Sequence, residues 1–461
     1  MTGAVAGWRI HGDRALYIRG PSTTSGSHHD CRRFGRTRCF LRLPGTIIAR
    51  QGRCLEVLDV LRGIALLGMF IVHFCDYAGV WDVPDGQKPA LWQQLEQWFL
   101  DGRFFTMFAM LFAIGFAVQL ARADARGESV VPRYLRRLAA LAVFGFIAEG
   151  IFGYNVLFGY ALWGIALLPI RRWSTRSLFI LLLVCSAFRP LWNVSRMAIA
   201  ESRGTVKEFA AQQQASNASF QKARTEHSAA NKSSQWSTVV MSRLRFMPKF
   251  QRQWNWNPSL TFTLMVAGLL AFRLGIFENP ASKRKTILLW MLIGAASFVI
   301  DTWVLPLAGA PSPGFGSLAN SPTPTRSMVI AIAMTNGFQL FRDSWLAFVY
   351  IGGVLLLVAH NRAWLKRLAP FAWTGRMALT NYMSQVIFLD VAFSNWAFGW
   401  KVTPPWILVW ALGLFTIQAL FARWWLTRFA YGPLEWVWRS VTYWRLAPFR
   451  QQPIVPHLAI A

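Results

Sequence analysis

The chain has 461 residues, of which 54% are hydrophobic and 15% are charged, and it carries a formal net charge of +28. A soluble chain cannot bury so much apolar surface, so the composition excludes a soluble globular protein and predicts an all-α, polytopic transmembrane helical bundle. The Lys and Arg residues are placed mainly in loops between apolar runs, where they indicate membrane orientation, and we expect no nucleic-acid partner.

Residues 1–50 are rich in Arg, Gly and Ser and predict a disordered basic N-terminal tail. No apolar stretch in the tail is long enough for a secretory signal peptide, so we expect the first transmembrane helix to act as the insertion signal. Two explanations of the tail stay open: a genuine segment, or an upstream start codon chosen by mistake. The histidines and cysteines of the tail lie in irregular chain, and we predict no metal site.

Ten apolar runs follow the tail, and each reaches or approaches the roughly 20 residues of helix that span a bilayer. They are Leu55–Cys75, Phe104–Ala121, Leu135–Gly153, Tyr154–Ile170, Ser177–Val194, Leu260–Phe277, Thr286–Leu305, Ser344–His360, Phe371–Phe393 and Trp406–Leu426. The shorter apolar segment Met328–Leu340 is interpreted as an interfacial or re-entrant piece. The pattern therefore predicts about ten transmembrane helices.

The predicted domain organisation has two transmembrane halves. Residues 51–194 form the N-terminal half with helices one to five, and residues 259–445 form the C-terminal half with helices six to ten. Residues 195–258 between them are polar and predict an external insert, with helix-forming composition in part of it. Residues 446–461 are predicted to be a C-terminal tail.

Every second short loop is basic, as the positive-inside rule expects of cytoplasmic loops. The segment 76–101 instead carries five acidic residues and is predicted to be external. This alternation predicts a multi-pass protein of the bacterial inner membrane with both termini in the cytoplasm and the lipid bilayer as its main partner. The oligomeric state is not predicted.

The first helix contains the most informative residues. Asp59, Arg62 and His73 lie in or at the edge of an apolar span, where an unpaired charge costs on the order of 3 kcal/mol or more. Asp59 and Arg62 are three residues apart and can pair, and Arg62 and His73 are eleven apart, which returns them to nearly the same face. Each residue alone favours an interfacial role, but the shared face favours a functional site.

The predicted outer ends of the third and fourth helices add polar groups near the level of His73. Glu149 ends the third helix, and Asn155 follows in a tight turn. A carboxylate near an imidazole can orient its tautomer or raise its basicity, so Glu149 is a candidate partner of His73. The alternative is an interfacial glutamate.

A polar strip runs along the predicted ninth helix. It contains Arg376, Asn381, Ser384, Gln385 and Asp390. Such side chains often hold transmembrane helices together, so helix packing and substrate binding are equally favoured here.

Four segments of the chain form recognisable motifs. Two are long: Gly375-Arg-Met-Ala-Leu-Thr-Asn-Tyr-Met-Ser-Gln385 and Tyr431-Gly-Pro-Leu-Glu-Trp-Val-Trp-Arg-Ser-Val-Thr-Tyr443. Two shorter ones, Leu58-Asp-Val-Leu-Arg-Gly63 and Gly115-Phe-Ala-Val-Gln119, lie in the N-terminal half. Through these segments the chain resembles the YeiB-like bacterial inner-membrane proteins, catalogued as domain of unknown function 418.

The first helix also resembles the opening helix of the acyltransferase-3 and heparan-glucosaminide acetyltransferase superfamily, in which an Arg is followed eleven residues later by a His. Arg62 and His73 match that spacing. The resemblance implies transfer from a cytoplasmic acyl-CoA to an acceptor on the far side, with His73 as general base or acyl carrier. The chain departs from the YeiB-like pattern, which usually has Asn at position 73, His near Glu149 and Asp near Asn155.

The leading prediction is therefore a transmembrane acyltransferase-like enzyme with acyl-CoA as co-substrate, no tightly bound cofactor, and a small-molecule or envelope acceptor. A solute or lipid-related transporter and a membrane scaffold are the alternatives. The predicted catalytic residues are His73 and Glu149. The predicted substrate-binding residues are Asp59, Arg62, Asn155, Arg376, Asn381 and Gln385.

Overall fold

The computed structural model describes residues 46–77, 90–154, 156–254, 260–300, 303 and 346–451. Within these residues the chain is built from helices without a β-strand, and the prediction of an all-α fold is confirmed. The predicted N-terminal tail up to residue 45, Asn155 and the segment Met328–Leu340 lie outside the described residues.

Six helices make up the described part of the N-terminal half. They are α1 (Thr46–Tyr77), α2 (Leu91–Phe99), α3 (Arg103–Ala125), α4 (Val131–Gly150), α5 (Val156–Ile170) and α6 (Thr175–Ser202). From Glu56 onward the chain forms one compact unit, in which α3 packs against α5 and α9 (Thr261–Arg273), and α4 packs against α5.

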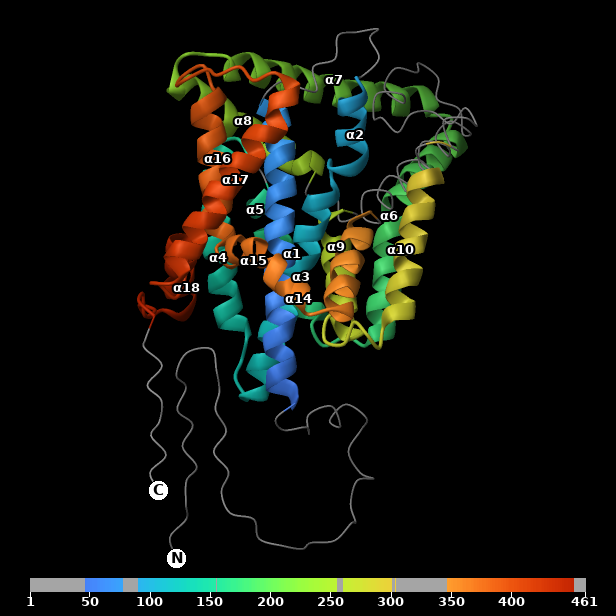
Figure 1. Ribbon diagram of the computed structural model, residues 1–461. Helices are drawn as coiled ribbons and strands as arrows, with labels where there is room; N and C mark the ends of the chain where they lie inside the picture. The colour runs from blue at the N-terminus through green and yellow to red at the C-terminus, as the bar shows by residue number, and fades with distance from the viewer. Residues whose placement is uncertain are drawn as a thin grey trace, which may run out of the picture. The chain divides into compact units, whose positions relative to one another are not determined.

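The polar insert consists of two helices, α7 (Val206–Asn231) and α8 (Trp236–Trp254). It begins as a continuation of α6, which extends to Ser202 and turns into α7 at Gly204, where φ is +67°. Figure 1 shows α7 lying crosswise over one end of the helices, and α8 packs against both α7 and α4. The predicted helical insert is therefore present, and it covers one end of the bundle.

The remaining helices belong to the C-terminal half. They are α9, α10 (Arg284–Val299), a helix at Leu346–His360, α14 (Ala363–Arg367), α15 (Ala369–Arg376), α16 (Ala378–Phe393), α17 (Pro404–Leu426) and α18 (Pro433–Tyr443). In Figure 1 the connection between α9 and α10 lies at the end opposite α7.

The predicted ninth helix, Phe371–Phe393, is divided into α15 and α16, which meet at Met377. A close helix crossing accompanies this break. A Cβ atom at Gly375 would lie 1.9 Å from the Asp59 carbonyl oxygen, and one at Gly63 would lie 2.0 Å from the Phe371 carbonyl oxygen. Glycine on both helices thus allows the backbones of α1 and α15 to touch.

Polar side chains satisfy the backbone at the break. Asn381 Nδ2 donates to the Thr374 carbonyl oxygen of α15 at 3.0 Å. The Glu435 carboxylate of α18 accepts from the backbone N–H groups of Leu379 and Thr380 at 2.6 and 3.0 Å, so it caps the first turn of α16. Burial raises the pKa of Glu435 above its ordinary value, although these hydrogen bonds oppose the rise. The two long YeiB-like motifs therefore contact each other directly.

Two described helices are long and apolar enough to cross a membrane, Arg103–Ala125 and Trp406–Leu426. Shorter apolar helices lie at Val156–Ile170, Thr175–Phe188, Thr261–Arg273 and Leu346–His360. An apolar surface faces outward on α17, where Ile417 and Leu420 are 62% and 58% exposed. The count of about ten spans stays a prediction.

Candidate functional site

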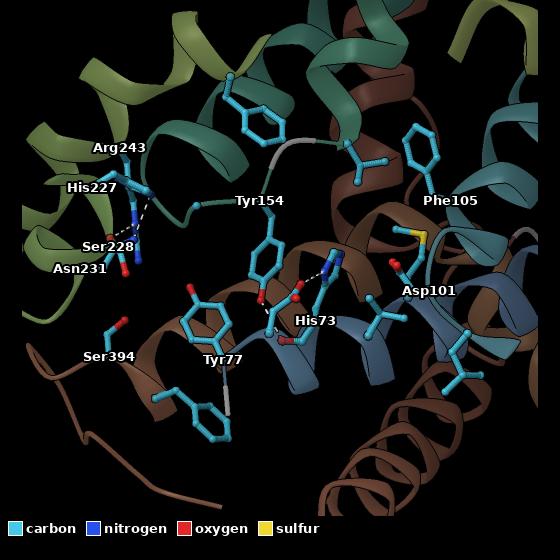
Figure 2. Close-up of a pocket in the computed structure, with 18 of the residues that line it drawn as sticks. His73, Tyr77, Asp101, Phe105, Tyr154, His227, Ser228, Asn231, Arg243 and Ser394 are labelled. Atoms are coloured by element: carbon cyan, nitrogen blue, oxygen red, sulfur yellow. Dashed lines mark hydrogen bonds and ion pairs between the residues drawn. The ribbon is translucent and has the colours of Figure 1, made fainter. Parts of the chain in front are cut away.

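A cavity of about 970 Å³ lies where the insert covers the bundle. Its walls come from the end of α1, the start of α3, the turn between α4 and α5, the helices α7 and α8, and residues 393–402. Figure 2 shows His73 near the middle of this cavity, with Arg243 and His227 of the insert on one side and Asp101 and Phe105 on the other. The insert therefore supplies part of the wall opposite the predicted catalytic histidine.

His73 is the predicted site residue that lines this cavity. Among the described residues neither of its buried ring nitrogens has a hydrogen-bond partner. The nearest carboxylate oxygen recorded for it is Asp76 Oδ2, 3.7 Å from Nδ1, which is beyond hydrogen-bond distance. An imidazole placed in this way can accept a proton from a ligand in the cavity.

Tyr154 holds the backbone and ring of His73, and Tyr77 packs against Tyr154. The Tyr154 ring lies 4.1 Å from the His73 ring, and its hydroxyl donates to the His73 carbonyl oxygen at 3.1 Å. Tyr77 packs on Tyr154 with ring centroids 5.4 Å apart. The Tyr77 hydroxyl donates to Asp390 Oδ1 at 3.0 Å. This chain of contacts connects His73 to α16.

Asp390 and Arg243 form a buried ion pair between α16 and the insert helix α8. The Arg243 Nη atoms donate to the two Asp390 oxygens at 2.7 and 3.1 Å, and the side chains are 0% and 3% exposed for Asp390 and Arg243. Ser394 Oγ adds a hydrogen bond to Asp390 at 2.6 Å. Burial alone would lower the pKa of Arg243, but the hydrogen bonds to the Asp390 carboxylate have the larger effect, so the pKa of Arg243 is raised above its ordinary value. The pair joins the insert to the bundle beside the cavity.

The second histidine of the cavity, His227, is fully bonded. Its Nδ1 lies 3.0 Å from Ser242 Oγ, and its Nε2 lies 3.0 Å from Asn231 Nδ2. Because an amide nitrogen donates, Nε2 accepts and Nδ1 carries the proton. Burial and the nearby Arg243 lower the pKa of His227 to about 4. His227 is therefore neutral at pH 7 and structural, in contrast to His73.

The predicted partner of His73, Glu149, has other contacts. Its Oε2 accepts a hydrogen bond from Gln251 Nε2 of α8, and its Oε1 has no partner among the described residues. Glu149 is buried at 5% exposure and does not line the cavity. Its pairing with His73 stays a prediction, and Asn155 lies outside the described residues.

The predicted residues at the other end of α1 form a charged cluster. Arg62 Nη1 donates to Asp59 Oδ1 at 2.8 Å, as their spacing predicted. The positive charge of Arg376 on α15 attracts the Asp59 carboxylate, and the negative charge of Glu56 repels it. The positive charge of Arg62 repels the guanidinium of Arg137 on α4. The Cζ atom of Arg137 lies over the Trp438 ring, 4.3 Å from the ring centroid. Arg62 and Arg376 therefore bring cations from two helices to Asp59, and Arg137 adds a third cation near Arg62. Guanidinium groups are well suited to bind phosphate.

Asn381 and Gln385 are buried at 2% exposure in helix contacts. Besides the bond from Asn381 to Thr374, Gln385 Nε2 donates to Gln418 Oε1 of α17 at 2.8 Å. These bonds stabilise helix packing, and the predicted substrate role of both residues stays a prediction.

The residues that sequence reasoning did not assign to the site come from the insert, from α1, from α16 and from the turn before α5. Arg243 carried no local signal, because it is one of many basic residues between Ser195 and Pro258. Asp390 did carry a signal, since an acid in an apolar helix needs a partner. Tyr154 also carried a signal, because it precedes Asn155 in the predicted tight turn at the level of His73. Tyr77 gave none, because tyrosine is common at membrane interfaces.

Two family models match different parts of the chain. Residues 271–445 match the family described as protein of unknown function (DUF418). Residues 54–199 match the family described as heparan-alpha-glucosaminide N-acetyltransferase, catalytic. This second match contains α1 with Arg62 and His73.

Several relatives cover most or part of the chain. The uncharacterized protein YxaH of Bacillus subtilis (strain 168) is 26% identical over 430 residues, which are 86% of this chain and 96% of the relative. An uncharacterized 39.9 kDa protein of Bacillus acidopullulyticus is 27% identical over 85% of this chain and 94% of its own length. The uncharacterized protein YeiB of Escherichia coli (strain K12) is 32% identical over 77 residues, 17% of this chain and 20% of that protein. No solved structure matches.

The helical fold and these matches define an all-α protein whose N-terminal half resembles an acyltransferase catalytic domain. The resemblance predicted from the two long motifs is confirmed. The C-terminal part of the chain resembles the YeiB-like family.

Proposed function

We propose that the chain is an enzyme of the bacterial inner membrane, with both termini in the cytoplasm, that transfers an acyl group from cytoplasmic acyl-CoA to an acceptor in the outer cavity. The observation that carries this proposal is His73, which lines a cavity of about 970 Å³, has buried ring nitrogens without a hydrogen-bond partner among the described residues, and shares one helix with Arg62. The match of that helix to an acetyltransferase catalytic family supports the same reaction class.

The cationic cluster at the opposite end of α1 is the proposed donor site. Arg62, Arg137 and Arg376 come from α1, α4 and α15 and offer forked donors to the phosphates of coenzyme A. Asp59 holds Arg62 in place through their 2.8 Å bond. The eleven residues from Arg62 to His73 correspond to about 16 Å of helix, which the pantetheine arm of the donor has to bridge.

The chemistry at His73 is general base catalysis. An acceptor hydroxyl or amine attacks the thioester carbonyl while an imidazole nitrogen of His73 takes its proton. The new C–O or C–N bond forms as the C–S bond breaks, and the proton passes from His73 to the departing thiolate. A positioned base of this kind contributes roughly 10²- to 10⁴-fold to the rate. Tyr154 keeps the imidazole in position through its ring contact.

The test uses radiolabelled acetyl-CoA with membranes that contain the overproduced protein, followed by extraction of labelled envelope components. Wild type is expected to label an acceptor, and His73→Ala is expected to label none while its thermal unfolding is unchanged. Equal labelling by His73→Ala would remove His73 from the mechanism.

Donor binding is measured separately by thermal unfolding with acetyl-CoA. A ligand at about 100 times its dissociation constant adds roughly 2.7 kcal/mol of stability. We expect this shift in wild type and in His73→Ala but not in Arg62→Gln. The absence of a shift with acetyl-CoA and with longer acyl-CoAs would contradict a donor site at Arg62.

A transporter is the second candidate, because the break between α15 and α16 resembles the discontinuous helices of carriers. However, the free N-terminus of α16 is occupied by Glu435 of the same chain, so it is not open to an anionic solute. Gradient-driven accumulation of a solute in proteoliposomes, without acyl transfer, would favour the transporter.

A further inference from the structure

A second cavity of about 200 Å³ lies among α6, α9, α10 and the helix Leu346–His360. Its lining is aliphatic or aromatic apart from Ser186 and Thr263. The Ser186 hydroxyl donates to the Leu182 carbonyl oxygen of its own helix at 2.8 Å. A water molecule needs two to four polar partners, which this lining does not supply, so the cavity favours a hydrocarbon group.

The cavity is bordered by apolar surface that faces outward. Phe179 and Leu183 of α6 line the cavity and are 45% and 52% exposed. Along the same helix Ile180 and Val184 are 60% and 57% exposed. In a membrane this surface faces lipid, so an acyl chain can enter the cavity from the side.

Basic side chains stand one turn away from the cavity on two of its helices. Arg176 precedes the lining residue Phe179 by three positions on α6, and Arg284 precedes the lining residue Ile287 by three positions on α10. Residues three apart share a helix face. Both arginines are exposed, so their guanidinium groups are available at the rim.

A third helix brings cations to the same rim. Arg273 ends α9 directly before the lining residue Leu274, and its Nη2 donates to the Arg171 carbonyl oxygen at 2.6 Å. That bond fixes the turn between α5 and α6 against the end of α9. The two connections at this end, together with the helix ends beside them, span residues 171–176 and 273–285 and contain seven cations against the single acid Glu278; the cations are Arg171, Arg172, Arg176, Arg273, Lys283, Arg284 and Lys285.

We propose that this apolar cavity binds an acyl chain of an anionic phospholipid of the cytoplasmic leaflet, with the phosphate headgroup held by Arg176, Arg284 and Lys285. The apolar cavity accounts for the chain, and the basic rim at the end opposite the insert accounts for the headgroup, since basic pockets between membrane helices bind anionic lipids. This inference uses the membrane location of the proposed function but not acyl transfer.

The test is native mass spectrometry of the whole protein released from mixed micelles that contain equal amounts of dioleoyl phosphatidylglycerol and dioleoyl phosphatidylcholine. The two lipids have the same acyl chains and differ in headgroup charge. Wild type is expected to retain one phosphatidylglycerol in preference to phosphatidylcholine by roughly tenfold or more. Equal retention of both lipids would contradict the proposal.

Two sets of variants separate headgroup from chain. Arg176→Gln/Arg284→Gln/Lys285→Gln is expected to abolish the preference for phosphatidylglycerol, whereas Arg122→Gln/Arg136→Gln/Arg445→Gln, with the same change in net charge elsewhere, is expected to keep it. If both triple variants lost the preference for phosphatidylglycerol equally, the preference would depend on net charge alone, and this result would overturn the proposed headgroup site.

The cavity itself is tested by filling it. Ala271→Phe adds a ring to a lining residue and is expected to remove the retained lipid with the cations intact. Leu183→Trp, at a half-exposed lining position, serves if Ala271→Phe does not fold, and Leu292→Phe on the exposed face of α10 is the matched control. Retention by both filled variants would overturn the cavity assignment.

A long-chain acyl-CoA has similar chemistry and is the competing occupant. Displacement of phosphatidylglycerol by an equal concentration of palmitoyl-CoA would assign the cavity to the donor and overturn the lipid proposal. No displacement would support it. Neither result depends on acyl transfer, so failure of the proposed enzyme activity is a distinct outcome.

Discussion

Arg243 and Asp390, 147 residues apart in sequence, form a two-pronged ion pair that is almost fully buried between the insert and α16. Charges this deep are stable only with a partner of good geometry. Asp390 also accepts from Tyr77, which packs on Tyr154 beside His73. The insert is therefore connected to the environment of His73 by direct contacts.

Removal of one partner of this pair is expected to destabilise the protein strongly. Arg243→Ala leaves Asp390 buried and unpaired, and we expect a loss of about 3–5 kcal/mol in the free energy of unfolding, measured by denaturant titration in detergent. Arg245→Ala, two positions along α8 and exposed, is the control and should change stability by less than about 0.5 kcal/mol. The double variant Arg243→Met/Asp390→Leu is expected to recover part of the loss; a double variant as unstable as the single one would argue against an unpaired charge as the cause.

The glycine crossing of α1 and α15 predicts a steric effect. In Gly63→Ala the new Cβ would lie 2.0 Å from the Phe371 carbonyl oxygen, so the helices must separate, and we expect a loss of about 3 kcal/mol or more. At Gly413 of α17 a Cβ meets nothing within 4 Å, and Gly413→Ala is expected to be neutral or to stabilise by up to about 1 kcal/mol. Thermal unfolding of both variants compares them, and similar melting temperatures would disprove the close crossing.

The cap on α16 predicts that the two YeiB-like motifs stabilise each other. Glu435→Gln removes the charge that accepts from Leu379 and Thr380, and we expect a loss of about 1–2 kcal/mol. Glu278→Gln at an exposed loop position is the matched control. Hydrogen exchange of the Leu379 and Thr380 amides should accelerate in Glu435→Gln only; unchanged exchange there would contradict the cap.

Glu96 on α2 predicts a pH dependence of stability. Burial, with Asp101 and Asp76 nearby, raises the pKa of its carboxyl from 4.5 to about 9. The folded state therefore holds the Glu96 proton more tightly than the unfolded state. The contribution of this proton to the stability of the folded state is complete below pH 4.5 and is lost as the pH rises toward 9. Glu96→Gln keeps the shape without titrating and is expected to be more stable than wild type at pH 8 by on the order of 5 kcal/mol, with little difference at pH 4. Parallel pH profiles of the two melting temperatures would rule out Glu96 as the cause.

Patterns among residues that are close together in the sequence predicted the helices and the ion pair that form within a single helix. Hydrophobic runs and composition predicted the all-α class and helical structure in the insert, where α7 begins at Val206. The three-residue spacing of Asp59 and Arg62 predicted their ion pair. Both depend on the regular geometry of one helix.

Contacts between distant segments were beyond local patterns. The pairing of Glu149 with Gln251 joins residues 102 positions apart, and nothing in either segment specifies the other. The break at Met377 adjoins the close approach of Gly375 to the carbonyl of Asp59, a contact that the apolar run Phe371–Phe393 does not encode. Tertiary packing decided these features.

The unbroken helix α1 fixes the distance between Arg62 and His73. Between Arg62 and His73 the helix has no break, and its crossing with α15 at Gly63 prevents sliding by steric contact. The separation of the two residues is therefore a property of helix pitch, about 1.5 Å for each residue. If Arg62 binds one end of a ligand, His73 contacts only the ligand atom that lies at the matching distance from that end. This helix would therefore select ligands by the position of their reactive group and not by the size of the acyl chain beyond it.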